Sequence, residues 1–161
     1  MKFKEIFEAF LDNKPFLKVL SVASVGKDNE PNCAPKMIID VISPNRIYLI
    51  EYKFTRTYGN IAINKKLSVS FMDDVNFRGY RLNGSCEIIE AGKEYDSVKA
   101  EWDKRLIKYE AERILKRTTG LHSARDAENV LPRDFVIIRF EAREGSFVEP
   151  DRVIRAIHRD N

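Results

Sequence analysis

Residues 16–51 read FLKVLSVASVGKDNEPNCAPKMIIDVISPNRIYLIE, and this stretch decides the fold. It contains three apolar runs, each of strand length and bounded by residues typical of turns. The runs span residues 16–25, 31–41 and 46–51, and the turns are Gly26–Glu30 and Ser43–Asn45. Because parallel strands need a crossover of a dozen or more residues, these short connections predict an antiparallel meander rather than a βαβ unit.

The residues outside this stretch complete a mainly β fold with helices at its periphery. Alternation predicts strands over residues 67–72, 80–89 and 134–142; apolar spacing predicts helices over 3–12, 55–64, about 93–117, and after Pro150–Asp151. About six strands that close on themselves form a small barrel. At 161 residues, we expect one domain, with its core in 16–90 and 134–142.

Two positions carry specific packing expectations. Gly84 interrupts the strand over residues 80–89, which predicts a bend or the close approach of another segment. Trp102 lies on the apolar stripe of the long helix, where we expect it to anchor that helix on the barrel.

Composition and charge exclude several classes of protein. The net charge is only +3 and both signs are mixed along the chain, so we expect no dedicated nucleic-acid binder. No apolar run approaches the roughly 20 residues of a membrane span, and acidic residues interrupt the N-terminal segment, so we expect a cytoplasmic protein with no membrane contact. Cys33 and Cys86 are predicted to be reduced, buried thiols. The isolated His122 and His158 are predicted to be exposed, and no metal site is expected.

Polar residues gather where the third strand leads into a short helix. Lys53, Thr55, Arg56 and Thr57 supply two cations and two hydroxyls there. A helix N-terminus has unpaired N–H groups and a partial positive charge, and arginine can bind a phosphate bidentately. The segment therefore suits a phosphate, although an ordinary solvated loop with a helix cap has the same composition.

The order of motifs resembles that of the FMN-binding split barrels, the pyridoxamine 5′-phosphate oxidase-like family. The motifs are VASVGKDNEPNCAPKM (residues 22–37), RTYGNIAIN (56–64), VSF (69–71) and GYRLNG (79–84), within residues 16–90. The resemblance implies a six-stranded antiparallel split β-barrel, bound FMN, a homodimer and flavin-dependent oxidoreductase activity.

The resemblance also implies roles for particular residues. Lys36, Met37 and Ile38 match the segment along the flavin ring, and Tyr52 and Lys53 match positions beside the ribityl chain and phosphate. Arg56 and Thr57 match the phosphate-binding pair, with the Thr55 hydroxyl nearby, and Asn60 matches a polar helix residue facing the ring or its tail. Tyr80 and Arg81 lie in the region expected from a second subunit.

The sequence leaves the reaction open. The Arg-rich C-terminal pattern for the vitamin B6 substrate is not found, and no side chain is an evident catalytic acid or base. The alternatives are a non-catalytic flavin or electron-carrier module, a relative that uses the deazaflavin F420 or haem, and a small-barrel nucleic-acid binder that uses Lys53, Arg56 and their basic neighbours.

Overall fold

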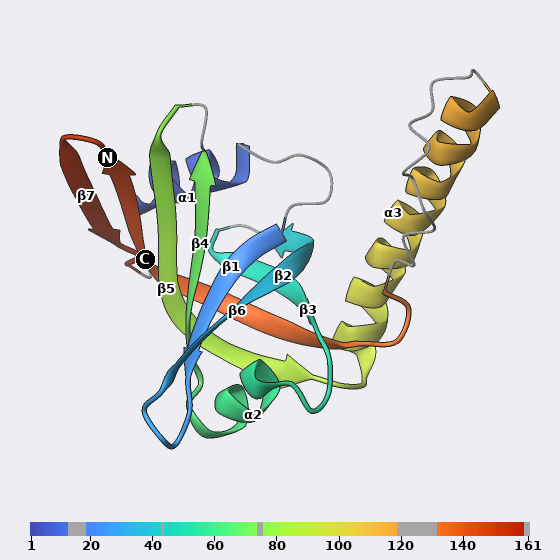
Figure 1. Cartoon of the computed structure of the whole chain (residues 1–161), viewed down its shortest axis with the longest axis horizontal. Helices are drawn as coiled ribbons and strands as arrows, with labels where there is room; N and C mark the ends of the chain where they lie inside the picture. The colour runs from blue at the N-terminus through green and yellow to red at the C-terminus, as the bar shows by residue number, and fades with distance from the viewer. Residues whose placement is uncertain (13–18, 43, 74–75, 119–131, 160–161) are drawn as a thin grey trace.

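A computed structural model of the chain describes residues 1–12, 19–42, 44–73, 76–118 and 132–159. Within these residues the chain forms three helices and seven strands (Figure 1). The helices are α1 (Phe3–Asp12), α2 (Arg56–Ile63) and α3 (Lys93–Thr118). The strands are β1 (Val19–Val25), β2 (Pro31–Ile42), β3 (Arg46–Glu51), β4 (Lys66–Asp73), β5 (Arg78–Ile89), β6 (Val136–Glu149) and β7 (Arg152–Ile157).

Six of the strands close into a barrel. They follow the order β3-β2-β1-β4-β5-β6, each neighbouring pair is antiparallel, and β3 pairs with β6 to complete the ring. The predicted mainly β, six-stranded antiparallel barrel with peripheral helices is therefore confirmed.

The C-terminal segment corrects one prediction. Residues 152–157 form the strand β7, paired with Glu144–Glu149 of β6, and not the helix expected after Pro150–Asp151. Strand β6 runs seven residues beyond the predicted end at Ala142, so its edge offers backbone partners to the returning chain. Because Val153, Ile154 and Ile157 fit a helical spacing as well as a strand, the apolar pattern alone favoured the wrong element.

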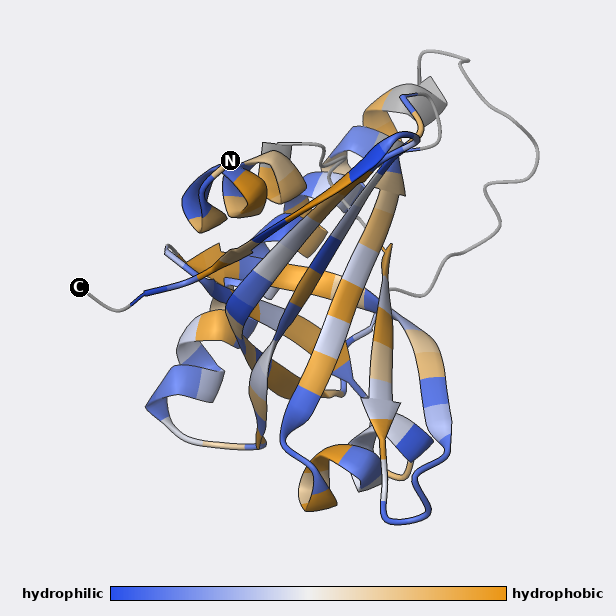
Figure 2. Cartoon of the chain, turned by 90° about the vertical axis from the view of Figure 1, so that its left-hand side faces the viewer, coloured by the Kyte–Doolittle hydropathy of each residue, from blue (hydrophilic) through white to orange (hydrophobic). Residues whose placement is uncertain are grey.

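The apolar side chains form two cores on opposite faces of β2 and β3. Ile38, Ile47 and Leu49 lie inside the barrel, whereas Ile39 and Tyr48 pack under α3. Because successive side chains of a strand point to opposite faces, the adjacent Ile38 and Ile39 are buried in different cores. Figure 2 shows hydrophobic and hydrophilic residues alternating along the strands. The four central residues of β3, Ile47–Ile50, are all buried and mainly apolar because both faces of the strand are covered.

Helix α3 is held at its N-terminal half and projects from the barrel (Figure 1). Trp102 has no exposed surface, its Nε1 donates to the Pro132 carbonyl at 2.8 Å, and its ring meets Phe135 edge-on with centroids 6.2 Å apart. The predicted anchoring role of Trp102 is confirmed.

Several single-residue expectations can also be compared with the structure. Cys86 is buried as expected, but Cys33 is exposed because it lies on the outward face of β2. His158 is half-buried against the Phe3 ring, with centroids 4.9 Å apart, rather than fully exposed. The start of the first predicted strand (residues 16–18) and His122 lie outside the described residues. No helix among the described residues has the length and apolar character of a membrane span.

Candidate functional site

The chain turns sharply between β3 and α2. Phe54 at this turn has a φ of 69° and is 97% exposed, a backbone conformation that is uncommon for a bulky side chain. Thr55 then caps α2, because its hydroxyl accepts the backbone N–H of Tyr58 at 3.0 Å. The N–H groups of Arg56 and Thr57 form no hydrogen bond with the described residues. This end of α2 therefore presents two free donors.

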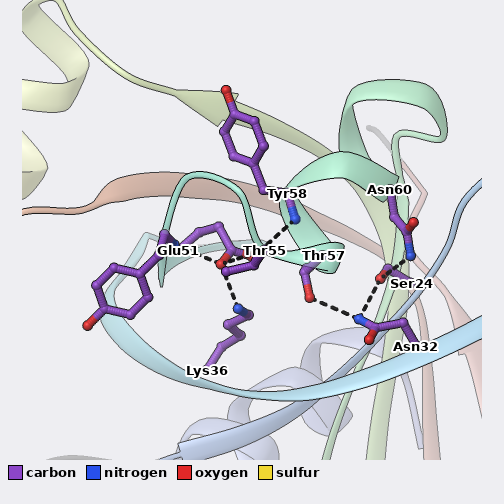
Figure 3. A network of polar contacts seen from close by, with 9 residues as sticks. Ser24, Asn32, Lys36, Glu51, Thr55, Thr57, Tyr58 and Asn60 are labelled. Carbon is purple, nitrogen blue, oxygen red and sulfur yellow. Dashed lines mark hydrogen bonds and ion pairs between the residues drawn. The ribbon is translucent and has the colours of Figure 1, made fainter.

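A buried ion pair lies directly beneath this turn. Lys36 Nζ is 2.6 Å from Glu51 Oε1, and their side chains are only 8% and 0% exposed. The same oxygen accepts the Tyr52 N–H at 2.7 Å and the Thr55 hydroxyl at 3.0 Å, which ties the helix cap to the end of β3 (Figure 3). Glu51 Oε2 is buried and has no hydrogen-bond partner.

Sequence reasoning placed Lys36 on the flavin ring and missed Glu51. The antiparallel register that pairs Ile38 with Leu49 sets Lys36 opposite Glu51, so the β2–β3 hairpin itself contained the signal. A carboxylate and an ammonium at facing positions of an apolar hairpin indicate a buried pair.

A second polar network holds α2 against the β1–β2 hairpin. Asn32 Nδ2 donates to Thr57 Oγ1 at 3.0 Å and to Ser24 Oγ at 3.3 Å, and Asn60 Nδ2 donates to Ser24 Oγ at 3.1 Å (Figure 3). Thr57 and Asn60 are buried. A Cβ at Gly26 would lie 2.3 Å from the Asn60 amide oxygen, so a side chain there would displace the Asn60 amide. The side chains of Thr57 and Asn60 thus fix the position of the helix.

The two predicted cations lie in different ion pairs. Arg56 Nη2 lies 2.7 Å from Glu30 and 3.1 Å from Asp28, and the Glu30 hydrogen bond raises the arginine pKa. Lys53 lies 2.8 Å from Glu90, whose hydrogen bond raises the lysine pKa. Both cations are about half exposed, so these pairs are weak and exchangeable. The structure keeps Arg56, and not Lys53, in contact with the β1–β2 turn.

The remaining predicted residues lie in different environments. Tyr52 is 46% exposed beside the turn, and Met37 is half-buried beside the core under α3. Ile38 points into the barrel core. Tyr80 is also buried there, whereas Arg81 is exposed, with Nη2 3.5 Å from Ser146 Oγ. Tyr80 and Arg81 lie in the first half of β5, whereas Tyr58 of α2 donates to Glu90, the residue directly after the other end of that strand.

The donors at this corner fit a phosphorylated cofactor. Two free N–H groups and the half-exposed Arg56 guanidinium lie at the start of α2, whereas the Thr55 hydroxyl already donates to Glu51. Phosphate binds such donor sets by charge-assisted hydrogen bonds. Among the described residues no group of three or more His, Cys, Asp or Glu side chains could hold a metal ion.

Comparisons with known proteins identify the family and the fold. The family model described as "Pyridoxamine 5'-phosphate oxidase" matches residues 4–149. No curated protein matches the chain at a significant level.

Solved structures share the fold at low sequence identity. A Clostridium acetobutylicum protein of the pyridoxinephosphate oxidase family, related to general stress protein 26 of B. subtilis, aligns with a TM-score of 0.65 and 19% identity, over 96% of this chain and 95% of that one. A pyridoxamine 5′-phosphate oxidase-related, FMN binding protein from Nostoc punctiforme gives 0.57 and 11%, over 94% and 84%. A heme binding protein from Mycobacterium smegmatis gives 0.59 and 13%, over 86% and 52%. Likenesses at this identity establish the fold alone.

Proposed function

Because the chain belongs to the pyridoxamine 5′-phosphate oxidase family, we propose that it is an FMN-binding flavoprotein that acts as an oxidoreductase. The observation that carries the proposal is the start of α2, where the Arg56 and Thr57 N–H groups and the Arg56 guanidinium are available to a phosphate. The solved FMN binding relative from Nostoc punctiforme has the same fold and supports the choice of cofactor.

Each part of the corner has a role in the proposed binding of FMN. Arg56 exchanges its contacts with Asp28 and Glu30 for the phosphate, which is feasible because both carboxylates are more than half exposed. The buried Lys36–Glu51 pair keeps the Thr55 cap, and so the free N–H groups, in place. Lys53 and Tyr52 flank the chain between phosphate and ring, and the β2 segment Lys36–Ile38 lies along the ring.

Bound FMN would supply hydride or single-electron transfer. The side chains of this chain would bind and orient the cofactor and exclude water from it. We further propose a homodimer in which Arg81 of a second copy completes the pocket, because this exposed side chain lies away from the α2 corner within one chain. Tyr80 is 4% exposed and packs in the barrel core, so its side chain does not serve the cofactor role expected from the sequence.

The test is a titration with FMN and, separately, with riboflavin, which lacks the phosphate. Absorbance and flavin fluorescence measure the binding of each ligand. We expect Arg56→Ala to weaken FMN binding by roughly 1.5–3 kcal/mol, about 10- to 150-fold, the cost of losing a hydrogen bond to a charged group. The variant should leave riboflavin binding unchanged. Arg152→Ala is the matched control, since Arg152 is exposed and paired with a carboxylate far from this corner. A folded Arg56→Ala protein with wild-type FMN affinity would refute the phosphate assignment.

Haem is the second candidate, favoured by the shared fold with the heme binding protein from Mycobacterium smegmatis. The two candidates have distinct visible spectra. Reconstitution with haem that yields a stoichiometric Soret band, together with no binding of FMN, would favour haem over the flavin.

A further inference from the structure

A second hollow lies on the outside of the barrel, away from the α2 N-terminus. Its volume is about 760 Å³, and its walls come from β1, β4, β5 and β6, with Ile63 and Asn64 at the other end of α2. The volume falls within the range of small-molecule pockets. The groove lies at the end of α2 opposite to Arg56, about 12 Å along the helix, and it shares one wall residue, Ser24, with the polar network that holds Thr57.

The walls of the groove are partly apolar. Ala23, Val25 and Pro31 line one side, and Ile63, which is 63% exposed, lines the end against α2. Short side chains on β1 leave the space open, and no described side chain covers Ile63 fully. An apolar ligand body would therefore remove hydrophobic surface from water here.

The lining of the groove carries three cations, Lys65, Lys66 and Arg143, and one carboxylate, Glu144, so its net charge is positive. Lys66 and Arg143 line it, and neither forms an ion pair within the described part of the chain. By contrast, Lys65 is 3.6 Å from Glu87, and the lining carboxylate Glu144 accepts the Asn83 amide at 3.3 Å. Two cations thus face the groove without a partner.

The two free cations lie on either side of one strand. Lys66 belongs to β4 and Arg143 to β6, and β5 lies between them, so the two strands are about 10 Å apart, two strand spacings. Through Ser85, Lys66 is level with Glu141, two residues from Arg143. Glu144 also lines a neighbouring hollow of about 390 Å³ with Arg155 and Arg159, which adds positive potential on the same side.

We propose that this groove binds a small amphiphilic organic anion, in which a carboxylate, sulfonate or phosphate is attached to an apolar body. Lys66 and Arg143 would bind the anionic group, and the β1 side of the groove would bury the apolar part. The proposal does not depend on the FMN site.

The probe for this test is 8-anilinonaphthalene-1-sulfonate, a fluorescent aromatic sulfonate, titrated into the folded full-length protein. We expect one site, with affinity reduced about tenfold or more in the double variant Lys66→Ala/Arg143→Ala, because charge-assisted contacts are lost. Lys104→Ala/Arg133→Ala is the control: it removes two exposed cations that belong to other ion pairs, and it should leave the affinity unchanged. The uncharged analogue N-phenyl-1-naphthylamine should bind all three proteins equally.

Amide shifts in ¹H–¹⁵N spectra locate the probe. Perturbations at Ser68, Asn83 and Ser85, which line the groove, support the proposal. Three outcomes would overturn it: unchanged affinity in the double variant, perturbations confined to another surface, or a dimer that binds the probe only after dissociation. The last outcome would mean that a second copy of the chain covers the groove.

Discussion

Glu51 is a carboxylate with no exposed surface at the end of an apolar strand. One of its oxygens accepts three hydrogen bonds and the other accepts none. A charge in such surroundings is tolerated only because Lys36 lies 2.6 Å away. The pair therefore connects stability to the shape of the candidate site, since the same oxygen holds the Thr55 cap.

Removal of one member of this pair should destabilise the fold strongly. We expect Lys36→Met to lower the free energy of unfolding by about 3–5 kcal/mol, because it leaves Glu51 charged and unpaired in the core. The double variant Lys36→Met/Glu51→Leu should lose less than Lys36→Met alone. Urea denaturation of both proteins measures the difference, and equal losses would mean that the two side chains are not coupled.

The second residue-scale prediction concerns the two cysteines. Burial raises the pKa of the Cys86 thiol to about 12 from an ordinary value of 9.0, whereas Cys33 is exposed. Since thiolate is the reactive form, we expect Cys33 to react with Ellman's reagent at once and Cys86 only on unfolding. Cys33→Ser is the control that isolates Cys86.

The raised pKa of Cys86 also makes the stability of the protein depend on pH. Below pH 9.0 the Cys86 thiol is neutral in both the folded and the unfolded state, so its contribution to stability is complete and does not change with pH. As pH rises from 9.0 towards about 12, only the unfolded chain ionises, so this residue's contribution to stability falls. Cys86→Ala should flatten the decline of stability over that window, and an unchanged slope would contradict the assignment.

Among the elements, β5 shows most directly how one residue shapes a strand. A side chain at Gly84 would place its Cβ 1.9 Å from the Glu141 carbonyl oxygen, and the register of β5 and β6 shifts at this point. The predicted close approach of another segment is confirmed. Backbone cannot move aside as a flexible side chain can, so the barrel requires glycine here.

We expect Gly84→Ala to destabilise the protein by about 2 kcal/mol or more, in the range of overpacking. Gly79→Ala on the same strand is the matched control, because its Cβ would lie 3.5 Å from Val148, an ordinary contact. It should change stability by less than about 0.5 kcal/mol. Thermal denaturation compares the two variants. Similar midpoints would show that the β6 backbone moves to accommodate a side chain at position 84.

At the scale of the whole molecule, the proposed pocket combines two chains. We expect light scattering to give twice the chain mass of 18.7 kDa. We also expect Arg56→Ala and Arg81→Ala each to weaken FMN binding. In a twofold dimer, a mixed pair of these variants has one site with both changes and one site with neither.

Mixing the two variants after unfolding and refolding should therefore restore about a quarter of the tight FMN sites, the fraction expected from random pairing of an isologous dimer. Flavin fluorescence quenching counts these sites. If the mixture binds no better than either variant alone, Arg56 and Arg81 do not meet across two subunits.

The sequence by itself determined the barrel strands, the cap at Thr55 and the anchoring of α3 by Trp102. These features depend on local spacing, turn residues and side-chain size, which are visible along the chain. Motif order was sufficient to indicate the family, and the family model that matches residues 4–149 agrees with it.

Only the tertiary structure decided which charges meet. Glu51 reaches Lys36 across a hairpin register, Arg56 reaches Asp28 and Glu30 across 26 or more residues, and residues 152–157 became a strand because β6 offered a free edge. Each outcome depends on distances between segments that are remote in the chain. The hairpin register determines the first of these distances, and the arrangement of the barrel strands determines the others, which no local pattern encodes.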